Sequence, residues 1–158
     1  MSQFRVEKQR ADAEITLAAG TRVRGAFFLA GSSVADAGRP ERIGDLLNAE
    51  SGFFPFETGP GDAGTLLVNR AHLVTVRLID RGDEPQLDPG YDVATARDVA
   101  MLLTDGRTLR GTVRVYRPQG RDRLSDYARS SDLFRYLETR EGTFIVNSAH
   151  IVSIYETH

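Results

Sequence analysis

The chain has 158 residues and a formal net charge of −2, with 41% apolar and 27% charged residues. This balance is typical of a folded globular protein and excludes a disordered or collagen-like chain. Cysteine is absent, which excludes disulfides and cysteine-ligated metals. No apolar run approaches the ~18 residues of a membrane span, and the charged start of the chain lacks the apolar stretch of a secretory signal. We expect a cytoplasmic protein with no membrane contact.

Three blocks of the sequence occur twice, in the same order. The matching blocks are residues 13–25 with 99–111, 42–58 with 123–139, and 64–76 with 142–154. The blocks have the same residue at 16 of 43 aligned positions, far more than unrelated segments share by chance. We therefore infer an internal duplication. A run of Pro, Gly and charged residues lies between the copies and predicts a linker. The predicted domains are residues 1–80 and 97–158, joined by a linker over 81–96.

The first block of each copy predicts a β-hairpin. Its turn contains Gly20 in the first copy and Asp105-Gly106 in the second, and glycine tolerates the positive φ that such turns need. Gly25 and Gly111 lie inside the second strand of each hairpin. A glycine there predicts a bulge or a sharp bend, which curls a sheet.

The second block changes from strand to helix periodicity. Ile43, Leu46 and Leu47 are spaced i, i+3, i+4, which predicts a short amphipathic helix, and the second copy has the same spacing from Leu124. Extended segments follow at 53–56 and 133–137. The third block predicts two more strands around a tight corner, so each copy reads β-β-α-β-β-β.

The predicted unit resembles the Sm-like, SH3-type small barrel. Residues 103–111 resemble the first Sm motif, with an Asp-Gly turn before a strand glycine, and residues 145–151 occupy the place of the second. The resemblance implies a mainly β fold of two tandem small barrels. The tandem pattern also resembles an uncharacterised bacterial family built from this unit. RNA-binding Sm proteins carry Arg-Gly or Lys-His at the second-motif corner, where this chain has Asn69-Arg70 and Asn147-Ser148.

Arginine is concentrated in the second copy. The chain has 19 Arg and one Lys, and nine of the arginines lie between residues 107 and 140. Alternating positions on one strand form a face that could contact phosphates and stack a base. A solvated face with internal ion pairs is the alternative interpretation. The candidate nucleic-acid or anion contacts are Arg107, Arg110, Arg114, Tyr116 and Arg117.

Two further sets of residues occur in both copies. Each copy has an Arg and an Asp at i, i+3 on the helix, which could hold an anion or brace a neighbouring loop. Each also has an Asn and a His at the corner, where a zinc site lacks a third ligand and a structural turn is the simpler interpretation. We interpret all eight as structural: Arg42, Asp45, Asn69, His72, Arg123, Asp126, Asn147 and His150.

The sequence predicts a non-catalytic interaction or structural module that binds itself or another protein. No acid, base and nucleophile occur at a recognisable catalytic spacing, and no cofactor or metal site is expected. A small barrel of about 70 residues buries little apolar surface alone, which favours association of the two copies or of several chains. The alternative is single-stranded RNA binding through the Arg-rich second copy, with affinity that falls steeply as salt rises.

Overall fold

The computed structural model describes residues 8–31, 40–59, 64–116, 124–128 and 132–157, without the side chains of Asp126 and Ala128. We call residues 8–78 the first unit and residues 95–156 the second unit. The first contains β1 (Lys8–Leu17), β2 (Arg22–Ala30), α1 (Ile43–Ala49), β3 (Phe53–Thr58), β4 (Thr65–Asn69), η2 (Arg70–His72) and β5 (Leu73–Leu78). The second contains β6 (Thr95–Leu103), β7 (Thr108–Val115), α2 (Leu124–Ala128), β8 (Phe134–Thr139), β9 (Gly142–Asn147), η5 (Ser148–His150) and β10 (Ile151–Glu156).

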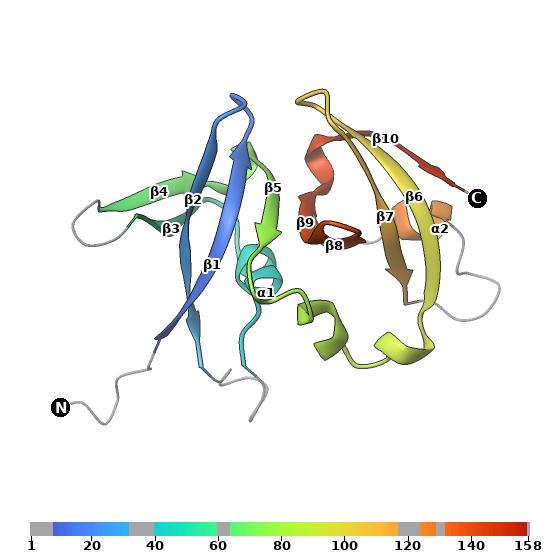
Figure 1. Cartoon of the computed structure of the whole chain (residues 1–158), viewed down its shortest axis with the longest axis horizontal. Helices are drawn as coiled ribbons and strands as arrows, with labels where there is room; N and C mark the ends of the chain where they lie inside the picture. Colours follow the sequence, from blue (N-terminus) through green and yellow to red (C-terminus); the bar gives the residue numbers. More distant parts are fainter. Residues whose placement is uncertain (1–7, 32–39, 60–63, 117–123, 129–131, 158) are drawn as a thin grey trace.

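The described strands form one antiparallel sheet of ten, in the order β10-β6-β7-β8-β9-β5-β1-β2-β3-β4 (Figure 1). The predicted mainly β fold is confirmed, and both units have the order β-β-α-β-β-β. The expectation that each unit closes into its own barrel is wrong. Closure would need the outer edge of the last strand of each unit, and in the first unit that edge of β5 is occupied by β9 of the second.

The turn glycines behave as the hairpin chemistry requires. Gly20 and Gly106 both have φ of +88°, a conformation that costs other residues energy and glycine almost none. The amide of each closes a tight turn: Gly20 N–H donates to the Leu17 carbonyl at 2.8 Å, and Gly106 N–H donates to the Leu103 carbonyl at 2.9 Å. The two hairpins therefore follow from local sequence.

Gly25 and Gly111 do not mark a bulge, one of the two roles that the sequence predicts, and the sharp bend stays a prediction. The register of β1 with β2 runs through Gly25 without a shift, and that of β6 with β7 runs through Gly111 in the same way. A Cβ at Gly25 would lie 2.0 Å from the Glu57 carbonyl oxygen, and one at Gly111 would lie 2.5 Å from that of Glu138. Glycine is required because the backbones of β3 and β8 approach these strands so closely at that point.

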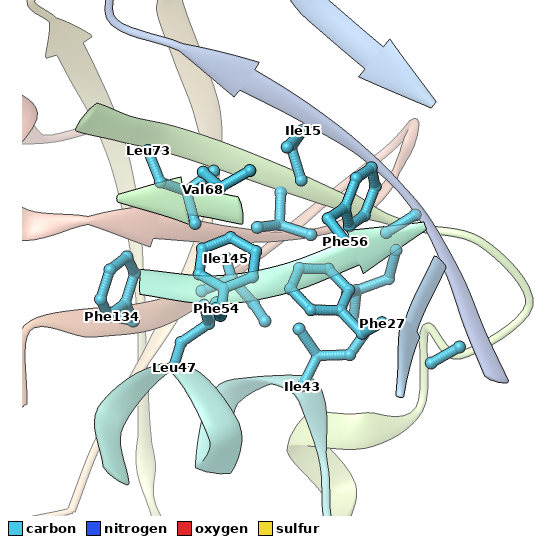
Figure 2. Close-up of a cluster of buried hydrophobic side chains, with 14 of the residues drawn as sticks. Ile15, Phe27, Ile43, Leu47, Phe54, Phe56, Val68, Leu73, Phe134 and Ile145 are labelled. Carbon is cyan, nitrogen blue, oxygen red and sulfur yellow. The ribbon is translucent and has the colours of Figure 1, made fainter. Parts of the chain in front are cut away.

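Two clusters of buried apolar side chains lie along the sheet. The first gathers around Phe27, Phe54 and Phe56, whose rings stack or meet edge to face at 5.1–5.3 Å. Phe134 and Ile145 of the second unit belong to this cluster, and Figure 2 shows both among the first-unit side chains. The two units therefore share a core.

Two short turns connect the units, η3 (Glu84–Leu87) and η4 (Tyr91–Val93). Glu84 is buried, so this connection packs against the units along part of its length. No helix within the described ranges is both long and apolar enough to cross a membrane.

Candidate functional site

The two units meet through the pairing of β5 with β9. Thr75 lies opposite Val146, and Val76 lies opposite Ile145, in an antiparallel register. All four residues are at most 1% exposed. The junction is a continuous part of the sheet, with its side chains packed as in a domain core.

The side chain of Asn147 makes three hydrogen bonds, two of which connect the units. It is fully buried. Its Oδ1 accepts from the Ala149 backbone N–H at 3.0 Å, which caps the turn η5. Its Nδ2 donates across the junction to the carbonyls of Arg70 at 3.2 Å and Leu73 at 2.8 Å. Both amide protons of Asn147 are thus used on the other unit.

His150 and Arg107 also cross the junction. His150 Nε2 lies 2.8 Å from the Ala71 carbonyl oxygen, and its Nδ1 lies 2.8 Å from Thr104 Oγ1. Because a carbonyl only accepts, Nε2 carries a proton there, and in the neutral ring Nδ1 accepts from the threonine hydroxyl. Arg107 donates from NH2 to Thr75 Oγ1 at 2.7 Å.

The helix α1 adds a fourth contact across the junction. Asn48 Nδ2 donates to the Phe134 carbonyl and Asn48 Oδ1 accepts from the Phe134 N–H, both at 2.9 Å. The ring of Phe134 then enters the first core at 3% exposure. Burying a Phe side chain contributes about 2 kcal/mol, so this residue holds the units together through both backbone and ring.

β4 and β10 are the two outer edges of the sheet, and both carry exposed apolar side chains. Leu67 is 66% exposed on β4, and Val152 is 60% exposed on β10. Leu66 and Tyr155 on the same strands are also exposed, as is Phe53 at the start of the neighbouring β3. Edge strands usually carry charges or Pro that prevent pairing with another chain, and the β4 sequence Thr-Leu-Leu-Val-Asn has neither.

The exposed edge residues occupy the positions that are buried at the junction. In the aligned copies, Leu67 of β4 corresponds to Ile145 of β9, and Val152 of β10 corresponds to Val74 of β5. Ile145 is 1% exposed and Val74 is fully buried. The sheet therefore ends, on both sides, in the apolar pattern that it buries in the middle.

Asn69 repeats the geometry of Asn147 at the outer edge. Its φ and ψ are −78° and 121°, against −77° and 115° for Asn147. Its Oδ1 accepts from the Ala71 N–H at 3.0 Å, the same cap as in the second unit. The Nδ2 of Asn69 has no partner among the described residues, whereas that of Asn147 donates to two carbonyls. His72, the neighbouring predicted residue, is exposed.

The structure places Arg107 beside Asp105. Arg107 Nε lies 2.8 Å from Asp105 Oδ2, and the Arg107 N–H donates to Oδ1 at 3.0 Å. Burial alone would raise the pKa of Asp105, but the bonds from Arg107 outweigh it and hold the pKa below its usual value. Arg107 therefore braces the hairpin turn and the junction.

The other predicted anion contacts are engaged within the chain. Arg114 Nε lies 3.2 Å from Glu138 Oε2, and its guanidinium stacks on the Tyr91 ring at 4.3 Å. Arg110 NH2 donates to a tyrosine hydroxyl on β10 at 3.3 Å, and Tyr116 OH donates to a linker aspartate at 3.3 Å. Arg117 and Arg123 lie outside the described residues, as does the side chain of Asp126.

Arg42 and Asp45 lie in a charged network at the start of α1. Arg42 NH2 lies 2.8 Å from Asp45 Oδ1, and the Arg42 N–H donates to Oδ2 at 3.0 Å. Burial would lower the pKa of Arg42, but the bond to Asp45 and nearby negative charge raise it above its usual value. Glu84 of the linker accepts from the Ile43 N–H at 3.0 Å and from Tyr136 OH at 2.9 Å. The linker, the helix and the second unit thus meet at one buried carboxylate.

Sequence reasoning missed the buried roles of Arg70 and Glu84. Arg70 is 4% exposed and donates to the carbonyls of Leu47 at 3.1 Å and Leu46 at 3.0 Å at the end of α1. The only signal was its replacement by Ser148 in the second copy. The burial of Glu84 carried no signal, because its partners Ile43 and Tyr136 lie 41 and 52 residues away along the chain.

The described part of the chain holds no group of three His, Cys, Asp or Glu residues arranged to bind a metal ion. No protein-family model, curated protein or solved structure is significantly similar to this chain. The interpretation of the site therefore depends on its geometry.

Proposed function

We propose that this chain is a non-catalytic structural module, built from two Sm-like units, that assembles with copies of itself. β10 of one chain would pair with β4 of the next, as β5 pairs with β9 inside the chain. Such a head-to-tail contact uses two different surfaces, so it produces a ring if its rotation closes and a filament if it does not.

One observation carries this proposal: the outer edges expose the apolar positions that the junction buries. A chain that worked alone would expose Leu67 and Val152 to water without benefit. Pairing would remove about two thirds of each side chain from water, which contributes roughly 1–2 kcal/mol for each. Leu66 and Tyr155 lie on the same two edges, so pairing of β10 with β4 in the register of the junction would bury a continuous apolar strip.

The junction supplies the register of the proposed contact. Placing the aligned residues in the pairing of β5 with β9 sets Ser153 opposite Val68 and Ile154 opposite Leu67 of the next chain. Asn69 would then donate to the carbonyls of Ser148 and Ile151, the counterparts of those that Asn147 binds. The unpartnered amide of Asn69 supports this register.

The pairing of the arginines favours self-association over nucleic-acid binding. Arg107 and Arg114 each contact a carboxylate at 2.8–3.2 Å. A phosphate would have to displace these carboxylates, and most of the electrostatic gain that drives such binding would be lost. Pairing of the apolar edges β10 and β4 would displace no carboxylate.

The test uses two variants that each block one edge, Leu67→Asp on β4 and Val152→Asp on β10. An aspartate in a buried strand pairing is left without a partner, at a cost of several kcal/mol. We expect the wild-type chain to form oligomers in sedimentation velocity and light scattering, and each variant alone to be monomeric. A mixture of the two variants retains one intact contact, so it should form dimers of one chain of each kind and nothing larger.

Val93→Asp is the matched control, because Val93 is 87% exposed on η4, outside both edges. It should assemble like the wild type. A wild-type chain that stays monomeric at high concentration would refute the proposal. Dimers of the Val152→Asp variant alone would show β4 pairing with itself, and they would refute the head-to-tail contact.

A further inference from the structure

A second feature, separate from the sheet edges, is a cavity of about 540 Å³ between the linker and the second unit. We call it the linker cavity. Its walls come from α1, from the linker around Pro85 and Asp88, from the end of β7, from α2 and from β8. This volume lies in the range of sites that hold small molecules.

The second unit lines the linker cavity with polar residues that the first unit lacks. Arg135 corresponds to Phe54, and Tyr116 corresponds to Ala30. Phe54 stacks in the first core, whereas Arg135 stacks on the Tyr127 ring at 4.6 Å in the cavity wall. The second unit therefore has a polar cavity wall where the first unit has apolar core packing. Such departures from good packing are expected where a protein has a site.

The Tyr127 hydroxyl is a second, independent sign of an occupant. The Tyr127 side chain lines the linker cavity and is 8% exposed. Its hydroxyl makes no hydrogen bond of good geometry among the described residues, although the nearby Arg135 interacts with it electrostatically. Buried hydroxyls nearly always have a partner, and an orphaned one costs about 1–3 kcal/mol.

The charges in the wall decide which ligand fits. Three arginines, Arg42, Arg114 and Arg135, face four carboxylates, those of Asp45, Asp88, Asp132 and Glu138. The Arg42 guanidinium already contacts two of these carboxylates at 2.8 Å, and that of Arg114 contacts a third. An anion would therefore meet two arginines, Arg42 and Arg114, that already contact carboxylates.

A cation would find better partners. Carboxylate oxygens keep spare lone pairs after accepting one bond. The Tyr116 ring is 45% exposed at the cavity, and tyrosine faces attract cations. Burial raises the pKa of Tyr116, and the neighbouring Asp88 carboxylate raises it further.

We propose that the linker cavity binds a small planar organic cation, such as an amidinium, a guanidinium or a protonated aromatic amine. The cation would lie against Tyr116 and donate N–H groups to Asp88 and its neighbouring carboxylates. The site exists within one chain, so it does not depend on the proposed assembly.

The test compares three probes of one shape and different charge: benzamidinium, benzamide and benzoate. Each is titrated into the full chain at neutral pH and followed by backbone amide NMR shifts. We expect saturable shifts for benzamidinium at the amides of the cavity wall, with benzamide about tenfold weaker and benzoate weaker still. Equal or tighter binding of benzoate would overturn the proposal, as would benzamidinium shifts that do not saturate.

Two variants locate the binding. Asp88→Asn and Tyr116→Leu should each weaken benzamidinium about tenfold, and Asp12→Asn, at an exposed carboxylate on β1, should leave it unchanged. Because Asp88 also contacts the buried Arg42, a thermal melt checks its folding, and the exposed Tyr116 carries the test if Asp88→Asn unfolds. Benzamidinium affinity unchanged in Tyr116→Leu would place the binding elsewhere and refute the site.

Discussion

The two corner asparagines offer a matched measurement of the junction. Asn69 and Asn147 cap their turns in the same way, each with an Oδ1 that accepts from an N–H at 3.0 Å. Only Asn147 also donates from Nδ2 across the junction. Replacing each by Ala therefore removes the same cap, and in one case two further bonds.

The magnitudes follow from these bonds. Losing a turn cap costs about 1 kcal/mol, which is the whole expected effect of Asn69→Ala in a single chain. Asn147→Ala also leaves the carbonyls of Arg70 and Leu73 without this donor in a fully buried place, which adds about 2 kcal/mol. We expect Asn147→Ala to lower the free energy of unfolding by about 3 kcal/mol.

The assay is urea unfolding of both variants in the Val152→Asp background, where the proposed assembly is blocked. With an m-value of about 2 kcal/mol/M, the extra 2 kcal/mol moves the Asn147→Ala midpoint about 1 M below that of Asn69→Ala. Equal midpoints would refute the reasoning, because they would mean that the bonds across the junction contribute nothing. In the chain with both edges intact, Asn69→Ala should also weaken assembly about thirtyfold, the equivalent of 2 kcal/mol.

Three further predictions concern the single chain. Gly25→Ala should cost about 3 kcal/mol, because its Cβ would meet a backbone oxygen at 2.0 Å, whereas Gly82→Ala, with its nearest atom at 3.6 Å, should stay within about 0.5 kcal/mol in urea unfolding. The bonds from Arg107 hold the pKa of Asp105 below its unfolded value, so this carboxylate stabilises the fold above pH ~4 and loses that contribution as pH falls. Asp105→Asn should flatten the acid side of the stability profile, and an unchanged slope would contradict the assignment. Burial raises the pKa of Tyr127 to about 12, so its ionisation in the unfolded chain lowers stability as pH rises from ~10 to about 12. Tyr127→Phe should remove part of that alkaline loss and, with no bond to lose, raise stability near neutral pH by up to about 1 kcal/mol in thermal melts.

The parts of the fold that could be predicted from sequence are those encoded over a few residues. The Asp105-Gly106 turn and the i, i+3, i+4 spacing from Ile43 depend on backbone preferences that act locally. For the same reason the order of elements along a unit was accessible, but the pairing of its first strand with its last, β1 with β5 and β6 with β10, was not. The role of Gly25 could not be predicted, because a glycine that permits a bend and one that permits the close approach of a neighbouring strand look alike in sequence.

The pairing of β5 with β9 could not be predicted. Thr75 and Val146 lie 71 positions apart, and a short apolar run is the same whether its strand is central or at an edge. The sequence could show that the copies repeat, but not which edge of one meets which edge of the other. The buried carboxylate of Glu84 was inaccessible for a related reason, since its charge and its turn-rich neighbours are typical of an exposed linker.

The repeat itself connects the central junction with the outer edges. A strand whose edge faces water can lose its apolar residues without loss of stability, and pressure against aggregation favours charges there. In β4 and β10 the junction-facing positions nevertheless hold Leu67 and Val152, while the first unit still places an asparagine at 69 with its amide unused. If β4 and β10 were exposed to water in the working protein, only β5 and β9 would need the apolar pattern of the junction. The pattern is also present on β4 and β10, as two surfaces that pair with each other require. The mixture of the two edge variants is therefore the decisive experiment.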